Sequence, residues 1–298
     1  MKEARSTARV LPGTGASGSI RWSGFLTTFP SAGDRMGLLA TGRLRLRYGR
    51  AALAGLLLLL ALPLALRGQG RDGGDSQSSA TVEYQGRFAF TRIRYGSGVD
   101  EWGFRGGGAR WAHDYPRADR HLSQILAELT TISVHAEGTN VFHLDDPELF
   151  KHPVAYVSEP GFWTMTDSEA RSVRSYLLRG GFLIFDDFEQ EQWFNFEAQI
   201  QRVLPEYRLI ELDISHPIFH CFFDLKTIDF PHPLVPVYPS YFGIFENNDP
   251  TQRMLAIVNY NADVAEYWEW SDQGFFPVDI TNEAYKLGVN YVVFAMTH

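Results

Sequence analysis

The sequence predicts an α/β fold with a mostly parallel sheet that is covered by helices. Strand-like and helix-like segments alternate from about residue 88 onward, as expected when crossover helices connect parallel strands. The segment Phe182–Phe185 is apolar at every position, and strands with two apolar faces are typical of covered parallel sheets. A well-marked helix start at Thr166 precedes this segment.

The first half of the folded region supplies three expected strands and one helix. Phe88–Tyr95 alternates apolar and polar residues, which predicts a strand. A helix is expected over Arg117–Thr130, because leucine and isoleucine recur there on one helical face. Short strands are expected at Val141–His143 and Val154–Val157.

The next helix has the clearest boundaries. Thr166 and Glu169 have the spacing of a capping box, in which each side chain accepts a hydrogen bond from a backbone amide that the helix leaves free. Gly180 is the expected C-cap. The Phe182–Phe185 strand follows, and another helix is expected over Phe196–Leu204 before a proline stops it.

The last third of the chain is less regular. His216–Pro250 is rich in proline and aromatic residues, and it predicts a long irregular excursion over the sheet. Ala284–Leu287 is interpreted as the end of a helix, and Tyr291–Ala295 as the final strand.

Charge divides the chain into two parts. Residues 1–79 contain eleven Lys/Arg against four Asp/Glu, whereas residues 80–298 contain 16 basic and 31 acidic residues. We expect an N-terminal segment over 1–80 and one acidic folded domain over 81–298. This charge argues against nucleic acid as a partner of the folded domain, because nucleic-acid binding needs clustered Lys/Arg.

The apolar run 51–66 follows four arginines and resembles the core of a secretion signal. It is short for a membrane span, which needs about 20 residues. A start at Met36 would give the preceding basic region an ordinary length. The run is compatible with cleavage after export and with a tether in the inner membrane. We therefore expect a periplasmic or other extracytoplasmic location.

A glycine-rich loop from Gly96 to Gly108 follows the first strand. Free backbone amides in such a loop can cradle an anion, and nearby arginines can clamp it. The candidate arginines are Arg92, Arg94 and Arg105. The loop lacks the dinucleotide and P-loop fingerprints, so we expect no cofactor. A surface loop without a ligand is the alternative.

Asp186 and Asp187 come directly after the apolar strand, where ligands bind in open α/β sheets. Neighbouring strand residues point to opposite faces, so at most one of them is expected in a given pocket. The other is expected to accept backbone amides at a turn. Turn chemistry for both is the alternative.

An acidic and aromatic segment runs from Asn259 through Asp263 to Trp270. Its oxygen atoms could hold Ca²⁺ or Mg²⁺, although the spacing is not that of an EF-hand. Exposed tryptophans such as Trp268 would instead suit a carbohydrate. A buried aromatic pair beside a solvated acidic edge is the third interpretation.

Other sequence patterns that could indicate a catalytic nucleophile or a metal site are weak. His216 and His220 are four residues apart, but a proline between them disfavours the helix that a zinc pair needs, so we expect no metal site. Cys221 is the only cysteine, so it forms no internal disulfide, and its aromatic neighbours predict a buried thiol.

Several motifs together resemble the domain-of-unknown-function family 4159. They are Phe88-x-Phe-x-Arg-Ile-x-Tyr95, Trp111-x-x-Asp-Tyr-Pro-x-Ala-Asp119, Leu178-Arg-Gly-Gly-Phe-Leu-Ile-Phe-Asp-Asp187, His216-Pro-Ile-Phe-His220 and Leu287-Gly-Val-Asn-Tyr291. The resemblance implies a flavodoxin-like three-layer sandwich similar to class I glutamine amidotransferases and ThuA-like proteins. It also implies a bacterial, exported or membrane-linked protein with partners in the envelope.

Two function classes follow. The first is a non-catalytic ligand-binding or scaffold domain, with Asn259 and Trp268 beside the arginines. The second is a hydrolase of a carbohydrate or another envelope substrate, which needs two carboxylates across the bond that is cut. Its candidates are Asp187 or Asp186 paired with Asp263 or Glu269. Cys221 lacks the glycine-flanked elbow of an amidotransferase nucleophile, so glutaminase activity is not expected.

Overall fold

The computed structural model describes residues 81–97 and 109–298. The apolar run 51–66, the rest of the N-terminal segment, and the part of the glycine loop that contains Arg105 lie outside the described residues. No helix within the described ranges has both the length and the apolar character needed to cross a membrane.

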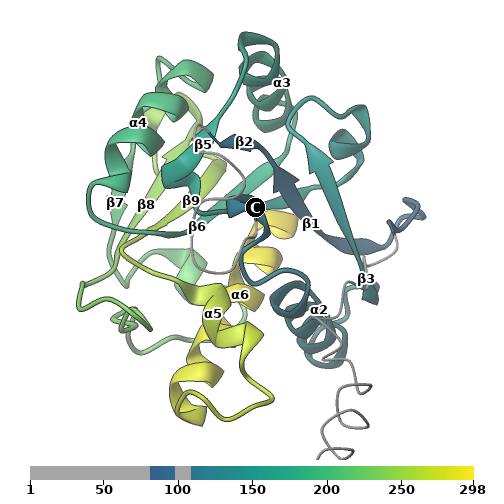
Figure 1. Cartoon of the computed structure of the whole chain (residues 1–298), viewed down its shortest axis with the longest axis vertical. Helices are drawn as coiled ribbons and strands as arrows, with labels where there is room; N and C mark the ends of the chain where they lie inside the picture. The colour runs from purple at the N-terminus through teal and green to yellow at the C-terminus, as the bar shows by residue number, and fades with distance from the viewer. Residues whose placement is uncertain (1–80, 98–108) are drawn as a thin grey trace, which may run out of the picture. The chain divides into compact units, whose positions relative to one another are not determined.

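The described part of the chain forms a seven-stranded sheet in the order β3-β1-β4-β6-β9-β8-β7 (Figure 1). The first five strands in this order are parallel to one another, whereas β8 is antiparallel to both of its neighbours. The strands are β1 (Phe88–Arg94), β3 (Val134–His143), β4 (Val154–Ser158), β6 (Phe182–Phe188), β7 (Ile210–Leu212), β8 (Ser240–Phe245) and β9 (Met254–Tyr260). A separate two-stranded sheet pairs β2 (Gly96–Ser97) with β5 (Trp163–Thr164). The predicted α/β fold with a mostly parallel sheet is therefore confirmed.

Helices cover both faces of the sheet (Figure 1). One face packs against α2 (Arg117–Leu129), α5 (Val264–Glu269) and α6 (Val278–Thr297), and the other packs against α3 (Asp167–Leu178) and α4 (Gln192–Val203). Alternation along β6 shows why its first four residues, Phe182–Phe185, are all apolar. Phe182 and Ile184 join the first core, whereas Leu183 and Phe185 join the second.

The expected helix boundaries in the first half are mostly confirmed. Both hydrogen bonds of the capping box are present: the Thr166 side chain accepts from the Glu169 amide, and the Glu169 side chain accepts from the Thr166 amide. Gly180 lies one residue beyond the C-cap with a φ of 112°, a conformation that favours glycine. The helix expected over Phe196–Leu204 begins earlier, at Gln192.

The strand expected at Tyr291–Ala295 is wrong, because these residues belong to α6. The run of valine and aromatic residues favours a strand locally, but burial of the helix against the sheet outweighs that preference. The excursion over His216–Pro250 is also less irregular than expected. It contains β8, which completes the sheet beside β9.

Gly288 lets α6 approach its neighbours closely. A Cβ atom at this position would lie 2.6 Å from Cζ2 of Trp268 and 3.0 Å from Cδ1 of Leu122. Glycine is usually unfavourable inside a helix, so the close contact accounts for its presence here.

We expect Gly288→Ala to lower the free energy of unfolding by about 1–3 kcal/mol, because the new methyl group overpacks the core. Alanine in an open helical position would instead stabilise by up to about 1 kcal/mol. Urea unfolding measures the change. Asn282→Ala on the exposed side of α6 is the control and should stabilise by about 0.5 kcal/mol through helix propensity alone; a similarly stabilising Gly288→Ala would contradict the packing described.

Candidate functional site

Polar side chains converge where β4, β6 and β9 end. The registers place Ser158 beside Asp186 and Phe188 beside Tyr260, so the carboxyl ends of the three parallel strands lie side by side. Ligands bind at this edge in open α/β sheets. Functional side chains are therefore expected at this edge.

Asp186 is fully buried and holds three elements together. Its carboxylate accepts hydrogen bonds from the hydroxyl of Tyr156 (2.8 Å) and Nδ2 of Asn259 (3.0 Å). It also accepts from the backbone amides of Val264 (2.9 Å) and Ala265 (3.2 Å), at the start of α5. Burial raises the pKa of this carboxyl although these bonds act in the opposite direction. Asp186 thus accepts backbone amides as one of the two acids was expected to, but from a helix almost 80 residues later.

Asp187 is turned away from the regular strand by a bulge. The register between β6 and β9 passes from Phe185↔Val258 to Phe188↔Tyr260, so Asp186 and Asp187 together oppose one residue. Asp187 has a φ of 65°, which is unfavourable for most residues but tolerated by Asp and Asn. Strict alternation therefore does not hold at this pair.

The side chain of Asp187 meets a loop that precedes α2. Its Oδ2 accepts a hydrogen bond from Oγ of Ser158 (3.1 Å) and lies 2.7 Å from Nδ1 of His113. Burial and the nearby carboxylates of Glu159 and Asp186 raise the pKa of Asp187 well above its usual range. His113 itself is half-buried.

Asp114, the next residue in this loop, has an unsatisfied buried carboxylate. It is only 4% exposed, and no N–H or hydroxyl group within the described ranges donates to its carboxylate oxygens. Its carboxyl neighbour Glu269 can bond to it only when one of the two groups is protonated. Its Oδ1 lies 3.7 Å from Nδ1 of His113. Burial and the nearby Asp263 raise the pKa of Asp114 well above its usual range. Such a group costs free energy unless something compensates for it.

Asp263 approaches the same place from the start of α5. One of its oxygens accepts a hydrogen bond from the amide of Glu266 (3.1 Å), which makes Asp263 the N-cap of the helix. Burial and the charges of Asp187 and Asp186 raise its pKa well above the usual range.

We call five of the side chains at this place the edge cluster: His113, Asp114, Asp187, Asp263 and Glu266. Asp186 is not one of them. Donor atoms of His113, Asp187 and Asp263 all lie within 4.8 Å of one another, as do those of His113, Asp114 and Glu266. Imidazole and carboxylate groups at such separations can hold a divalent metal ion. No metal site was expected from the sequence, and no sequence pattern pointed to His113 or Asp114 as ligands.

Residues 89–296 match the family model described as Domain of unknown function (DUF4159). The chain belongs to the DUF4159 family. A search of curated proteins found no match. The family resemblance expected from the motifs is thereby confirmed. The edge cluster combines two acids expected from the sequence, Asp187 and Asp263, with Glu266 of the segment Asn259–Trp270, and with His113 and Asp114, which no sequence pattern indicated.

Arg92 of the DUF4159 domain holds the loop of the site in place, and its own side chain is too deeply buried to contact a ligand. It is fully buried and forms an ion pair with Asp119 of α2. Its Nη1 also donates to the backbone carbonyls of Trp111 (3.2 Å) and His113 (2.7 Å). The expected role of Arg92 in ligand binding is therefore replaced by one in holding the loop that carries His113.

The other expected binding residues lie apart from the edge cluster or face the core. Arg94 is exposed and lies over the ring of Trp111, 5.5 Å from its centroid. Trp268 is 1% exposed and donates its indole N–H to the carbonyl of Ala284, so it offers no surface for stacking a sugar. Asn259 is buried between Asp186 and Tyr291.

Glu269 lies near the edge cluster but outside its two metal-ligating groups. It is partly buried, and burial together with the charge of Glu266 raises its pKa, although a hydrogen bond shared with the carboxyl of Asp114 acts in the opposite direction. Of the four carboxylates proposed from the sequence for catalysis, Asp187 and Asp263 are the two that the structure places in one potential ligand set.

Cys221 contacts α6 and no residue of the edge cluster. Its Sγ is 3.2 Å from the carbonyl of Asn290 in α6, and burial raises the pKa of the thiol to about 11. A thiol that stays protonated at neutral pH is a poor nucleophile.

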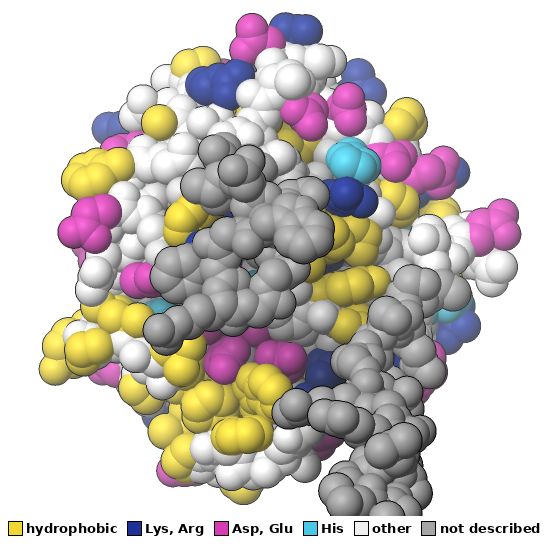
Figure 2. Space-filling model, in the orientation of Figure 1, with side chains coloured by type: hydrophobic (Ala, Val, Ile, Leu, Met, Phe, Trp, Pro, Cys, Tyr) yellow, Lys and Arg dark blue, Asp and Glu magenta, His cyan; other side chains and the backbone are white. Residues whose placement is uncertain are grey.

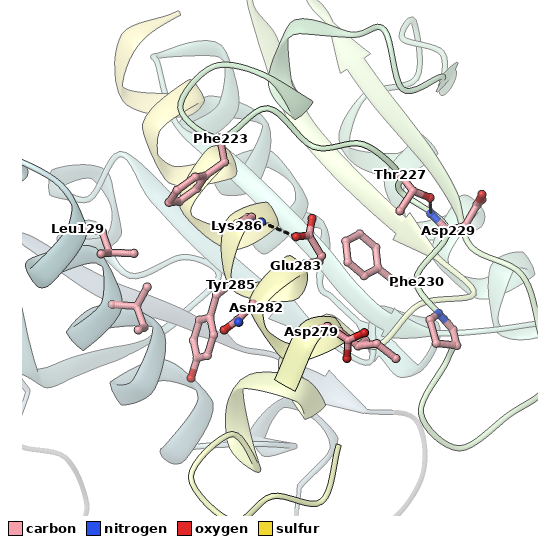
Figure 3. Close-up of a pocket in the computed structure, with 13 residues that line it drawn as sticks. Leu129, Phe223, Thr227, Asp229, Phe230, Asp279, Asn282, Glu283, Tyr285 and Lys286 are labelled. Atoms are coloured by element: carbon pink, nitrogen blue, oxygen red, sulfur yellow. Dashed lines mark hydrogen bonds and ion pairs between the residues drawn. The ribbon is translucent and has the colours of Figure 1, made fainter. Parts of the chain in front are cut away.

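A cavity of about 630 Å³ lies between α2, α6 and the segment 223–231 (Figure 3). Its charged residues include Glu283 and Lys286, which pair with each other, and none of its lining residues belongs to the edge cluster. Hydrophobic and acidic side chains are also exposed near α5 on the face shown in Figure 2. The cavity is separate from the convergence at the strand ends.

We expect Asp119→Asn to lower the free energy of unfolding by about 3–5 kcal/mol, because it leaves the buried guanidinium of Arg92 without its charged partner. Denaturant unfolding followed by circular dichroism measures the loss. Asp272→Asn, which removes an exposed partner of Arg117, is the matched control and should change stability by less than about 1 kcal/mol. Equal effects of the two substitutions would contradict the structural role of Arg92.

Proposed function

We propose that this DUF4159 protein is a ligand-binding domain whose binding site is the edge cluster. The observation that carries the proposal is the buried carboxylate of Asp114, to which no N–H or hydroxyl group among the described residues donates. Other buried acids of the domain have partners: Asp119 pairs with Arg92, and Asp186 accepts from four donors. A ligand that carries positive charge or hydrogen-bond donors would supply what Asp114 lacks.

The fold supports this role because it holds the site without a ligand. The ion pair of Arg92 fixes the loop on one side, and Asp186 fixes the start of α5 on the other. A preformed site loses less conformational entropy when a ligand binds. The buried position of Trp268 favours a small polar ligand over a carbohydrate that stacks on indole rings.

Replacing Asp114 by Asn tests whether the site is built for a ligand. We expect Asp114→Asn to raise the free energy of unfolding of the ligand-free protein by about 0.5–2 kcal/mol at pH 8, because the variant avoids burying an unpaired charge. Asn also tolerates the φ of 61° at this position. Chemical unfolding in a chelating buffer measures the change.

The difference between variant and wild type should depend on pH. The folded-state pKa of Asp114 is raised, so the folded protein binds this proton more tightly than the unfolded chain does. As the pH rises above about 4, the ordinary pKa of Asp, the unfolded chain releases this proton first, and the free energy of unfolding of the wild type therefore falls. The advantage of Asp114→Asn should grow from near zero at pH 4 toward pH 8. A destabilised Asp114→Asn at pH 8, comparable to Asp119→Asn, would show that Asp114 serves the fold and would overturn the proposal.

A hydrolase is the second candidate, and the closeness of Asp187 and Asp263 favours it. Their ligand oxygens lie within 4.8 Å of each other, and retaining glycosidases use carboxyl groups about 5–5.5 Å apart. The use of Asp263 as a helix N-cap makes it less available for proton transfer, so we place binding first. With envelope polysaccharides as substrates, hydrolysis that is absent in Asp187→Asn but present in wild type would favour the enzyme.

We also propose that the domain acts outside the cytoplasm, where envelope proteins are possible partners. The apolar run 51–66 after a basic segment supports export, with either cleavage or a membrane tether. The mature N-terminus recovered from periplasmic and membrane fractions distinguishes the two outcomes.

A relationship to the amidotransferase-like and ThuA-like folds is proposed on similar grounds. The mostly parallel sheet between two helical layers supports it. Glutaminase chemistry is not part of the proposal, because Cys221 contacts α6 and lies outside the strand edge where the acids converge.

A further inference from the structure

We infer that the edge cluster binds a divalent transition-metal ion of the zinc type, with the imidazole of His113 as its central ligand. This inference rests on the proposed function, since it assigns the ligand of the same site. The ion is held between carboxylates from the end of β6, from the start of α5 and from the loop before α2.

His113 lies close to several carboxylates. Its Nδ1 lies 2.7 Å from Oδ2 of Asp187, 3.7 Å from Oδ1 of Asp114 and 4.0 Å from Oε1 of Glu159. The imidazole also belongs to both trios of potential ligands. An ion beside Nδ1 is therefore within reach of carboxylates on more than one side.

The kinds of donor atom select the class of metal. Ca²⁺ and Mg²⁺ prefer sites made only of oxygen, whereas an imidazole beside carboxylates suits zinc and related transition metals. Bonds of about 2.0–2.2 Å place the ligand atoms of a tetrahedral ion roughly 3.3–3.6 Å apart. The trio of His113, Asp187 and Asp263 lies within 4.8 Å, so side-chain rotations of about an ångström close it around an ion.

A second, independent observation separates this cluster from an ordinary acidic patch. The carboxylate of Asp114 is buried, its Oδ1 lies 3.7 Å from Nδ1 of His113, and no N–H or hydroxyl group in the described part of the chain donates to it. The neighbouring carboxyl of Glu269 can bond to it only when one of the two groups holds a proton, a role that a cation takes over. Its backbone is held in place, because its carbonyl accepts from the amide of Ala118 (3.0 Å). The side chain thus starts from a fixed backbone and lies where a cation beside the imidazole could bind it.

The surroundings also provide the outer support that metal ligands need. Ser158 donates to Oδ2 of Asp187, and Arg92 donates to the carbonyl of His113. Such bonds orient ligands and are commonly worth 10–100-fold in metal affinity. Three protein ligands leave at least one coordination position for water or for a further ligand.

Metal binding to the full chain, without a histidine tag and stripped with a chelator, tests the inference. We expect Zn²⁺ at about 100 times its Kd to raise the Tm by roughly 5–10 °C, because an ion that binds only the folded state stabilises it. Ca²⁺ and Mg²⁺ at the same concentration should have a much smaller effect. Isothermal titration gives the affinity, and the visible absorption of bound Co²⁺ reports imidazole and carboxylate ligands.

His113→Ala should weaken Zn²⁺ binding at least about 100-fold and abolish the Co²⁺ absorption, because it removes the ligand common to both trios. His143→Ala, an exposed histidine at the end of β3, is the matched control and should bind as the wild type does. Asp187→Asn keeps the backbone conformation and should also weaken binding. Circular dichroism verifies that each variant is folded.

Unchanged Zn²⁺ affinity in His113→Ala, or no binding by the wild type, would overturn the metal assignment. The ligand-free stability of Asp114→Asn separates this failure from that of the proposed function. If that variant is stabilised while no metal binds, the site serves another ligand. If it is destabilised, both proposals fail.

Discussion

The buried carboxylate of Asp186 is the constraint on which the site depends. It connects β4 through Tyr156, β9 through Asn259, and α5 through two backbone amides. Tyr291 of α6 donates to Asn259, so this helix joins the same network. A buried charge has to be fully hydrogen-bonded to be tolerated, and satisfying Asp186 fixes where α5 begins. The positions of Asp263 and Glu266 follow from that.

A second buried charge, that of Arg92, fixes the other part of the site, the loop that carries His113. The ion pair of Arg92 and Asp119 ties β1 to α2, and the remaining N–H groups of Arg92 hold the loop that carries His113. The two networks meet at Asp187, whose bulge directs its side chain at the imidazole. The domain therefore uses hydrogen-bonded charges to position Asp114, to which no N–H or hydroxyl group of the described residues donates. A ligand at Asp114 would account for this contrast.

Local sequence signals were sufficient for the helices and strands that have strong caps or strict periodicity. The capping box at Thr166 and the apolar core of β6 are of this kind, and the edge where the acids lie follows from the parallel sheet. Tyr291–Ala295 was assigned wrongly because its strand-like composition is overridden by burial as part of a helix. His113 and Asp187 are 74 residues apart, and the bulge that aims Asp187 depends on pairing with β9. No local sequence pattern predicts the contact between His113 and Asp187 or the bulge that aims Asp187.

The arrangement of charge explains why a cation suits this edge better than an additional protein group. Several carboxylates share a volume from which water is largely removed, so each one disfavours the ionisation of its neighbours. Protons can relieve this repulsion at low pH. At neutral pH a divalent ion relieves it more completely, since it neutralises two charges at once and uses the carboxylates as ligands. The half-buried His113 leaves such an ion a route from solvent while providing the nitrogen ligand that discriminates among metals.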